Sequence, residues 1–240
     1  MGFEMLAFVA AVAAGAIASV AGFGIGSVLT PLLALRLGMR VAVAAVSVPH
    51  LIATALRFWL LRRHLDRRVL LTFGIASGAG GLAGALFQPH ASNVVLTRLL
   101  ASLLLFAGLS ELFGLVRAIR LGRTGAWMTG ALSGLFGGLV GNQGGIRSAG
   151  LLAFDVSKTS FVATATAIAL IVDGVRMPVY AVTAGRDLAV AWPLILIATI
   201  GVVVGTLAGS RPLHRIPERT FRRVVAVLLL ALAAWLLARA

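Results

Sequence analysis

Gly22-Phe-Gly-Ile-Gly-Ser27 is the stretch that decides the fold, and Gly141-Asn-Gln-Gly-Gly-Ile146 is its counterpart in the second half. Each interrupts an apolar segment that would otherwise continue as a membrane helix. Glycine disfavours a helix interior because it has the most backbone freedom to lose. In hydrocarbon, such a break is tolerated only where the freed backbone groups face protein or a water-filled cavity. One break in each half of a chain is typical of the binding site of a membrane transporter.

The composition indicates a membrane protein. Hydrophobic residues make up 60% of the chain and charged residues only 12%, whereas about 25% of a soluble protein is charged. The net charge of +14 would also suit nucleic-acid binding. The arginines, however, stand in short runs between apolar segments, as in loops at the anionic cytoplasmic face of a membrane. We therefore expect lipid, and no nucleic acid, as a partner.

The apolar segments predict an all-α protein with short loops. Crossing a bilayer takes about 20 residues, and the uninterrupted segments of that length are 41–61, 68–87, 95–116, 160–184, 189–209 and 220–238. Two further apolar segments, 3–38 and 124–157, contain the glycine breaks.

The halves 1–120 and 121–240 are predicted to be repeats. Gly141 follows Gly22 by 119 positions, and the same offset aligns Gly26 with Gly145, Leu32-Leu33-Ala34 with Leu151-Leu152-Ala153, and Arg57 with Arg176. Further along, Gly80 and Gly84 resemble Gly201 and Gly205, as small-residue pairs that let helices approach closely.

The charged loops predict that the repeats are inverted. Loop 62–68 is strongly basic and its counterpart 186–187 is nearly neutral, whereas 211–223 is more basic than its counterpart 90–98. By the positive-inside rule, equivalent loops then face opposite sides of the membrane. The basic loop 117–123 between the halves belongs in the cytoplasm.

This assignment of the loops to the two faces of the membrane predicts that each broken segment is a re-entrant hairpin. Only 160–184 crosses fully between an inner loop at 117–123 and an outer loop at 186–187, so 124–157 must enter and leave on one side, with arms of roughly 17 and 10 residues. By the repeat, 3–38 enters from the opposite side, and both termini are periplasmic. The alternative of eight full crossings would place either 62–68 or 211–223 on the wrong face.

The hairpin tips are the candidate anion site. The second arm of each hairpin begins after the glycines, and a helix N-terminus presents unpaired N–H groups and about half a positive charge. The candidate substrate-binding residues are Gly22, Gly24, Gly26, Ser27, Gly141, Asn142, Gln143, Gly144, Gly145, Arg147, Thr54 and Thr166. The alternatives are close helix packing for the glycines and bonding to the preceding turn for the threonines.

Five ionisable residues lie within the apolar segments near these tips. Arg147 is the best-placed cation for an anionic group, unless it extends to the membrane surface; for Arg57, close to a basic loop, we expect such an extension. Arg57 and Arg176 are also possible charge partners, and Arg176 can neutralise Asp173 three positions before it. Asp173 and His50 are possible proton-coupling groups, with structural roles as the alternative.

Enzyme motifs are absent from the sequence. It contains no HExxH, no GxxxxGK[ST] and no cysteine, so we expect no catalytic residue, no metal site and no cofactor. Glu111 is the only carboxylate of its segment, and the sequence suggests no partner for it.

The stretch Gly22-Phe-Gly-Ile-Gly-Ser-Val-Leu-Thr-Pro31, followed by Ala44-Ala-Val-Ser47, resembles the TauE/SafE sulfite exporter family, also called the 4-toluenesulfonate uptake permease family. The second half is similar to the family's repeated motif, from Gly134 to Gly145 and on to Thr164-Ala-Thr166. The resemblance implies ion-driven transport of sulfite, sulfonates such as sulfoacetate, or thiosulfate across a bacterial inner membrane. Gln143 stands where the family usually has glycine, and Gly150 where Pro31 would be matched, which affects the choice of anion.

Three other functions fit parts of the pattern. An anion channel would use the same tips, a membrane assembly or lipid-binding protein would not transport, and a cation carrier would need more carboxylates than Asp173 and Glu111. The sequence indicates neither the direction of transport nor the coupling ion nor the oligomeric state.

Overall fold

The computed structural model describes residues 2–114, 122–151, 154, 156–213 and 217–239, which are helical apart from short turns. Within these residues, six helices are long and apolar enough to cross a membrane: Gly2–Ala21, Ile25–His64, Arg67–His90, Asn93–Phe113, Thr159–Thr183 and Arg219–Leu237. The expected all-α membrane class is thereby confirmed.

The first half contains two long helices before its first tight loop. α1 (Gly2–Ala21) is separated from α2 (Ile25–Leu61) by the first glycine break, and α2 is itself interrupted by Gly38, which has a left-handed φ of 74°. The 3-10 turn η1 (Arg62–His64) leads to α3 (Arg67–Val69), the π-helical turn η2 (Leu70–Gly74), α4 (Ile75–Phe87), η3 (Gln88–His90) and α5 (Asn93–Phe113). The expected segment 41–61 is therefore the part of α2 that follows Gly38.

The second half begins with a break of the same kind. α6 (Arg123–Val140) and α7 (Gly144–Leu151) have 18 and 8 residues, close to the expected arms. They precede α8 (Lys158–Thr183), α9 (Gly185–Val190), α10 (Trp192–Leu213) and α11 (Glu218–Leu237). The prediction of a loop at 186–187 was wrong, because these residues lie in the short helix α9. The expected segment 95–116 was too long, because Gly114 ends α5 in a left-handed conformation.

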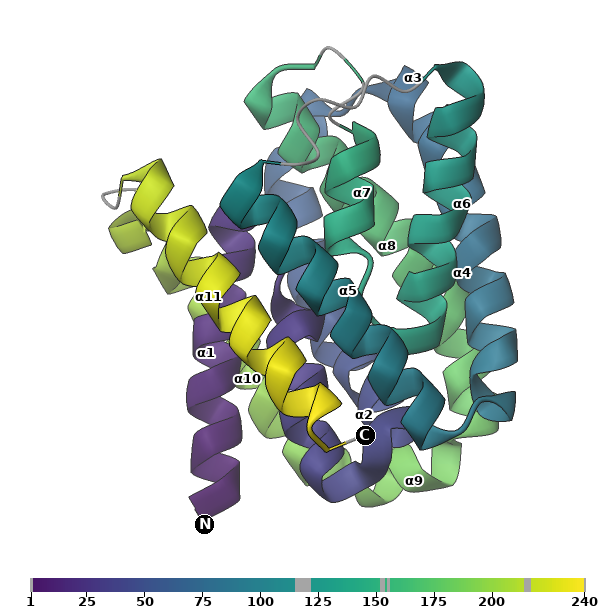
Figure 1. Ribbon diagram of the computed structural model, residues 1–240, viewed down its shortest axis with the longest axis vertical. Coiled ribbons are helices and arrows are strands. Elements are labelled where there is room, and N and C mark those ends of the chain that lie inside the picture. Colours follow the sequence, from purple (N-terminus) through teal and green to yellow (C-terminus); the bar gives the residue numbers. More distant parts are fainter. Residues whose placement is uncertain (1, 115–121, 152–153, 155, 214–216, 240) are drawn as a thin grey trace.

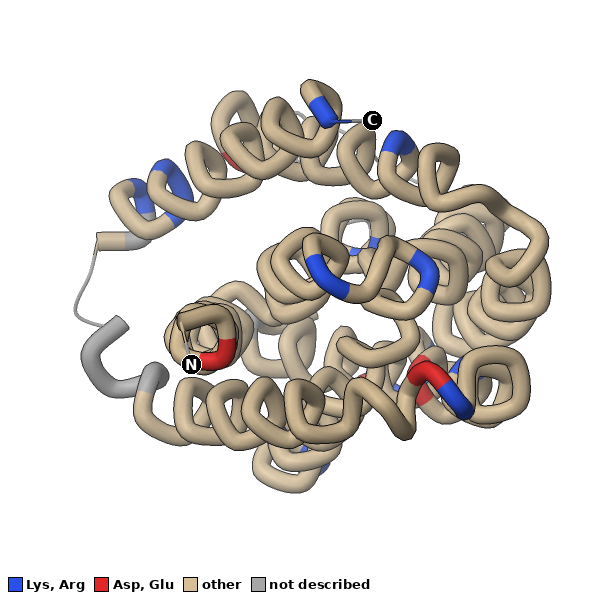
Figure 2. Tube along the Cα trace, turned by 90° about the horizontal axis from the view of Figure 1, so that it is seen from below, with Lys and Arg blue, Asp and Glu red and all other residues tan. Residues whose placement is uncertain are grey.

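The helices place the loops at two opposite ends of the molecule. α3 and the starts of α6 and α11 lie at one end, and α9 and the marked ends of the chain lie toward the other (Figure 1), from which the molecule is seen in Figure 2. Loop 62–68 is thus opposite to 186–187, as the charges indicated. Most of the basic loop between the halves, 117–121, and Arg215 lie outside the described residues, and which end meets the cytoplasm stays a prediction.

α1 and α6 enter from these opposite ends and carry their breaks into the interior (Figure 1). The 20 residues of α1 extend about 30 Å, as long as a full crossing, whereas the 8 residues of α7 extend about 12 Å. Length alone therefore does not decide whether α1 is half of a re-entrant hairpin, and the hairpins remain predictions.

Small residues bring two helix pairs into backbone contact, as predicted. A Cβ on Gly80 or Gly84 of α4 would lie 2.0 or 2.1 Å from a backbone oxygen of α6, and a Cβ on Gly205 of α10 would lie 2.0 Å from one of α1. A side chain at these positions would force the helices apart. α4 therefore packs against α6, and α10 against α1, in direct backbone contact.

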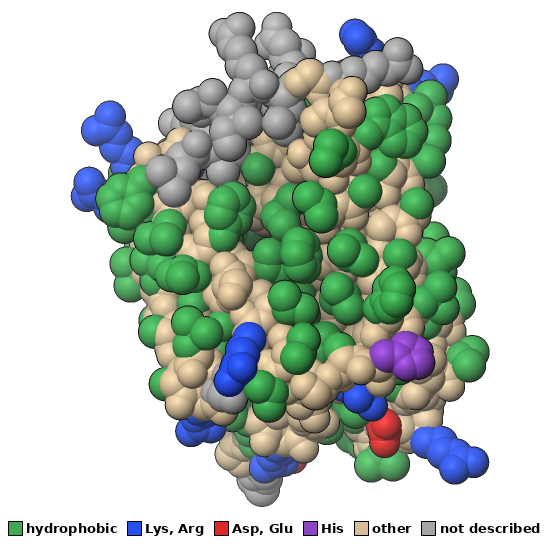
Figure 3. All heavy atoms as spheres, turned by 45° about the vertical axis from the view of Figure 1, so that its right-hand side comes forward, with side chains coloured by type: hydrophobic (Ala, Val, Ile, Leu, Met, Phe, Trp, Pro, Cys, Tyr) green, Lys and Arg blue, Asp and Glu red, His purple; other side chains and the backbone are tan. Residues whose placement is uncertain are grey.

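Apolar side chains cover the middle of the outer surface. In the view of Figure 3 they form a broad band, and Lys and Arg gather toward its upper and lower ends. Large exposed hydrophobic residues within the helices include Leu105, Leu132, Ile200 and Val227. This distribution matches a surface in contact with lipid.

Candidate functional site

The two glycine breaks have the same backbone geometry. Gly22 has a φ of 78° and Gly141 a φ of 71°, a left-handed conformation that L side chains rarely adopt. The N–H of Gly22 bonds to the carbonyl of Ala18 at 3.0 Å, and that of Gly141 to Gly137 at 3.1 Å. α1 and α6 therefore end with the same turn, which glycine makes possible.

The two breaks meet inside the protein. A Cβ on Gly26 would lie 2.2 Å from the carbonyl oxygen of Gly141, and one on Gly144 would lie 2.3 Å from the Cβ of Phe23. Asn142 donates a hydrogen bond from Nδ2 to Oγ of Ser27 at 3.1 Å. The sequence predicts two opposed tips that approach each other, and in the structure residues of the two tips are in direct contact.

Both second arms begin at this contact, and within the described residues their first amides make no backbone hydrogen bond. In α2 the first N–H that makes a helical hydrogen bond is that of Val28, which donates to the carbonyl of Gly24. In α7 it is that of Arg147, which donates to the carbonyl of Gln143. The amides of residues 25–27 and 144–146 precede that first bond, and no side chain caps α2. Two helix N-termini, each with a partial positive charge, thus begin at neighbouring positions.

Arg147 is buried at the same place. Its side chain is 2% exposed, and Nη2 donates to the carbonyl of Gly22 at 3.2 Å. Nε and Nη1 have no hydrogen-bond partner in the described part of the chain, and neither does Oε1 of Gln143, which is 4% exposed. The alternative of an arginine that extends to the membrane surface is therefore wrong for Arg147.

Arg57 and Arg176 bind the ends of the two broken helices in the same way. Each donates from Nη1 to a carbonyl 39 positions earlier: Arg57 to Ala18, and Arg176 to Gly137 at 2.7 Å. A cation is favoured at the negative end of a helix dipole, and each of these carbonyls accepts the arginine as a second donor beside the N–H of Gly22 or Gly141. Arg57 is 4% exposed, so the expectation that it extends to the surface was wrong.

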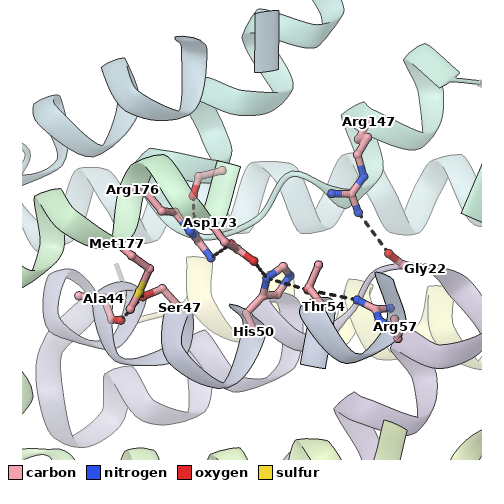
Figure 4. Close-up of polar contacts among 11 residues, drawn as sticks. Gly22, Ala44, Ser47, His50, Thr54, Arg57, Arg147, Asp173, Arg176 and Met177 are labelled. Carbon is pink, nitrogen blue, oxygen red and sulfur yellow. Dashed lines mark hydrogen bonds and ion pairs between the residues drawn. The ribbon is translucent and has the colours of Figure 1, made fainter. Parts of the chain in front are cut away.

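The two arginines are joined by a chain of buried polar contacts, which we call the polar chain: Arg176, Asp173, His50, Thr54 and Arg57 (Figure 4). Arg176 Nη2 lies 2.7 Å from Asp173 Oδ1, and Asp173 Oδ2 lies 2.6 Å from His50 Nδ1. Thr54 Oγ1 lies 3.4 Å from both His50 Nδ1 and Arg57 Nη2. The chain connects α8 to α2.

The buried charges at this place are unbalanced. Arg57, Arg147 and Arg176 are all at most 4% exposed, and Asp173 is the only buried carboxylate among the described residues. With His50 neutral, the group carries two positive charges more than negative ones. Burying an uncompensated charge is costly, and an anion bound here would offset the excess.

Three expected site residues contact other parts of the protein. Thr166 donates to the carbonyl of Val162 in its own helix at 2.7 Å, a Cβ on Gly145 would face Ala107 of α5, and one on Gly24 would face Ile17 of α1. Within the described part of the chain, no hydrogen bond joins Thr166 to the tips.

The structure also shows contacts that the sequence did not suggest. Phe23 packs against Gly144 at the tip contact, and the Ser133 hydroxyl donates to the carbonyl of Gln143 at 3.3 Å. Glu111 of α5 accepts from Nε of Arg222 of α11 at 2.8 Å. Phe23 lies within the glycine motif and could have been selected on that ground. Within the described residues, no three His, Cys, Asp or Glu side chains are grouped to hold a metal ion.

The comparisons with known proteins give one match. The family model described as "Sulfite exporter TauE/SafE" matches residues 7–236, nearly the whole chain. No curated protein and no solved structure matches.

Proposed function

Because the chain belongs to the sulfite exporter TauE/SafE family, we propose that it is a secondary transporter of small sulfur-containing oxyanions in the bacterial inner membrane. The cargo would be sulfite, thiosulfate, or an organosulfonate such as sulfoacetate. The family consists of transporters and not of enzymes, and the six apolar helices make this chain a multi-pass membrane protein.

The observation that carries the proposal is the guanidinium of Arg147. It is 2% exposed, and in the described part of the chain its only partner is one backbone carbonyl, that of Gly22. Two of its nitrogens, Nε and Nη1, are free donors. Nε and Nη1 lie on different edges of the planar guanidinium, so each can donate a separate hydrogen bond to an oxygen of a bound sulfonate or sulfite, in addition to the attraction of the charge.

The tip contact supplies the remaining donors. The free amides at residues 25–27 and 144–146, together with Ser27 and Asn142, surround the point where the two N-termini begin. Amide donors bind an oxyanion without a further buried cation. Gly26 packs directly on the carbonyl of Gly141, and Arg147 is 2% exposed, so in this proposal cargo enters and leaves through a change of conformation.

The helix pairing supports alternating access between inverted repeats. At the offset of 119, α1 corresponds to α6 and α2 to α7 and α8, and α4 and α5 correspond to α10 and α11. The packing of α1 against α10 is then equivalent to the packing of α6 against α4. α5 packs against α11, which is its own counterpart in the second half. Such an arrangement lets one half rock against the other around a central site. In this proposal both termini are periplasmic.

A binding titration tests the site. We expect purified protein to bind at least one of sulfite, thiosulfate and sulfoacetate, and we expect Arg147→Ala to weaken that binding by at least about 100-fold, since a hydrogen-bonded buried charge is lost. Arg98→Ala is the matched control, because Arg98 is exposed on α5. Unchanged affinity in a folded Arg147→Ala protein would reject the site.

Two other functions are separated by transport assays. A carrier in proteoliposomes exchanges labelled for unlabelled thiosulfate against a gradient, whereas an anion channel cannot. A non-transporting assembly protein would show no movement of thiosulfate in proteoliposomes. The buried excess of positive charge argues against that last function, since an assembly role does not need it.

A further inference from the structure

The polar chain contains the only histidine and the only carboxylate that are buried among the described residues, His50 and Asp173. It ends on the carbonyls of Ala18 and Gly137, at the two helix breaks that carry the proposed anion site. A change of charge within the chain therefore acts on both tips. We propose that His50, paired with Asp173, takes up a proton when the anion binds, so that proton and anion are carried together. This inference rests on the proposed function and names the coupling ion of the same site.

The hydrogen bonds indicate where the proton adds. An ionised carboxylate only accepts hydrogen bonds, so Nδ1 of His50 must donate to Oδ2 of Asp173 across 2.6 Å. The neutral ring then has no proton on Nε2. In the described part of the chain, Nε2 has no hydrogen-bond partner, and 9% of the His50 side chain is exposed. A proton on Nε2 makes an imidazolium that keeps its bond to Asp173.

The charged groups around His50 determine the sign of the coupling. Asp173 and Arg176 face it from α8, Arg57 lies on its own helix, and Arg147 lies on α7 at the tip contact. The described parts of α1, α5, α6, α9, α10 and α11 add no charged side chain that bonds to this group. The excess of positive charge is therefore two with neutral His50 and three with protonated His50.

An anion and a proton then favour each other's binding. The anion offsets the positive charge that the proton adds, and the proton strengthens the field that attracts the anion. Because the coupling of two binding events is reciprocal, anion binding must raise the affinity for the proton by the same factor. Exchange of a proton for the anion would require the opposite sign, which no charge in this group provides.

Thiosulfate is a suitable probe because its own charge does not change near neutral pH. With full-length protein in weakly buffered detergent solution, we expect saturating thiosulfate to cause uptake of a fraction of a proton to one proton per chain, seen with an indicator dye. We expect the affinity to be about tenfold tighter near pH 6 than near pH 8. Sulfoacetate, whose charge is also constant in this range, replaces thiosulfate if thiosulfate does not bind.

A variant assigns the proton to His50. His50→Gln should lose both the uptake and the pH dependence, whereas His64→Gln and His90→Gln, which change exposed histidines, should keep both. Uptake that persists in His50→Gln overturns the inference, and so does release of a proton. Uptake in the unmodified protein is decisive even if His50→Gln does not fold, because its absence would refute the coupling.

The two proposals fail in different ways. Anion binding without proton uptake and with the same affinity at both pH values would overturn the coupling alone. No binding of sulfite, thiosulfate or sulfoacetate would overturn the proposed function and the coupling with it.

Discussion

Replacement of Gly26 by alanine tests whether the two helix breaks are in contact. The new Cβ would lie 2.2 Å from the carbonyl oxygen of Gly141, and real Cβ atoms essentially never approach closer than 3.0 Å. The obstacle is backbone, so no side-chain rotation can relieve it. The tips would have to separate by roughly 1 Å, which would also move Asn142 away from Ser27, to which it bonds at 3.1 Å.

The expected cost follows from the energies of overpacking. Forcing a methyl group into a packed interior costs about 1 to 3 kcal/mol, whereas Gly→Ala at a site with free space stabilises a protein by about 0.4 to 1 kcal/mol. Gly185 is the matched control, because like Gly26 it lies in the first turn of a helix and has no positive φ, but has nothing within 4 Å of its added Cβ. Gly26→Ala should thus be less stable than Gly185→Ala by roughly 1.5 to 4 kcal/mol.

Denaturant unfolding in detergent, combined with an anion titration, measures both consequences. Gly26→Ala should unfold at lower denaturant concentration than the wild type and bind thiosulfate or sulfoacetate more weakly, and Gly185→Ala should do neither. If Gly26→Ala is as stable as Gly185→Ala and binds the anion as tightly as the wild type, the tips are not in contact in the functional protein.

Two further predictions concern residues outside the tip contact. Gly80→Ala and Gly205→Ala should each destabilise the protein by about 1 to 3 kcal/mol in the same unfolding assay, because either Cβ would lie 2.0 Å from a backbone oxygen; a cost at only one of them would contradict the equivalence of the two helix pairs. Thr166→Val should leave the anion affinity within about threefold of the wild type, because the hydroxyl already bonds to Val162 at 2.7 Å. A larger loss in the titration would return Thr166 to the binding site.

Features encoded by single residues could be predicted from the sequence. Glycine is the residue that tolerates a left-handed turn, so the glycine motifs at Gly22 and Gly141 could be proposed as breaks, although the glycines of 78–84 remain within helix α4. The close approach at Gly80 and Gly205 follows equally from the absence of a side chain. The membrane class follows from the apolar content of the helices. None of these needs knowledge of which helices are neighbours.

The partners of the buried charges depend on that knowledge. Arg57 is close in sequence to the basic loop 62–68, and this proximity suggested an exposed side chain, but its partner is the end of α1, 39 positions earlier. His50 and Asp173 are 123 positions apart, and Glu111 and Arg222 are 111 apart. Such pairs arise from the packing of α2 on α8 and of α5 on α11, which a single sequence does not reveal.

Aligning the two halves at the offset of 119 positions shows which buried polar contacts occur in both halves and which occur in only one. This offset aligns Arg57 with Arg176 and the carbonyl of Ala18 with that of Gly137, so the bond between arginine and helix end occurs in both halves. The same offset aligns Thr54 with Asp173, and both side chains contact the arginine three positions later. Only the second half therefore has a charge at that position, and only the first has the histidine that meets it. The His50–Asp173 pair has no duplicate in the other half. Arg57 and Arg176 nevertheless join it to the ends of both broken helices, so a change in the charge of the pair acts on both tips.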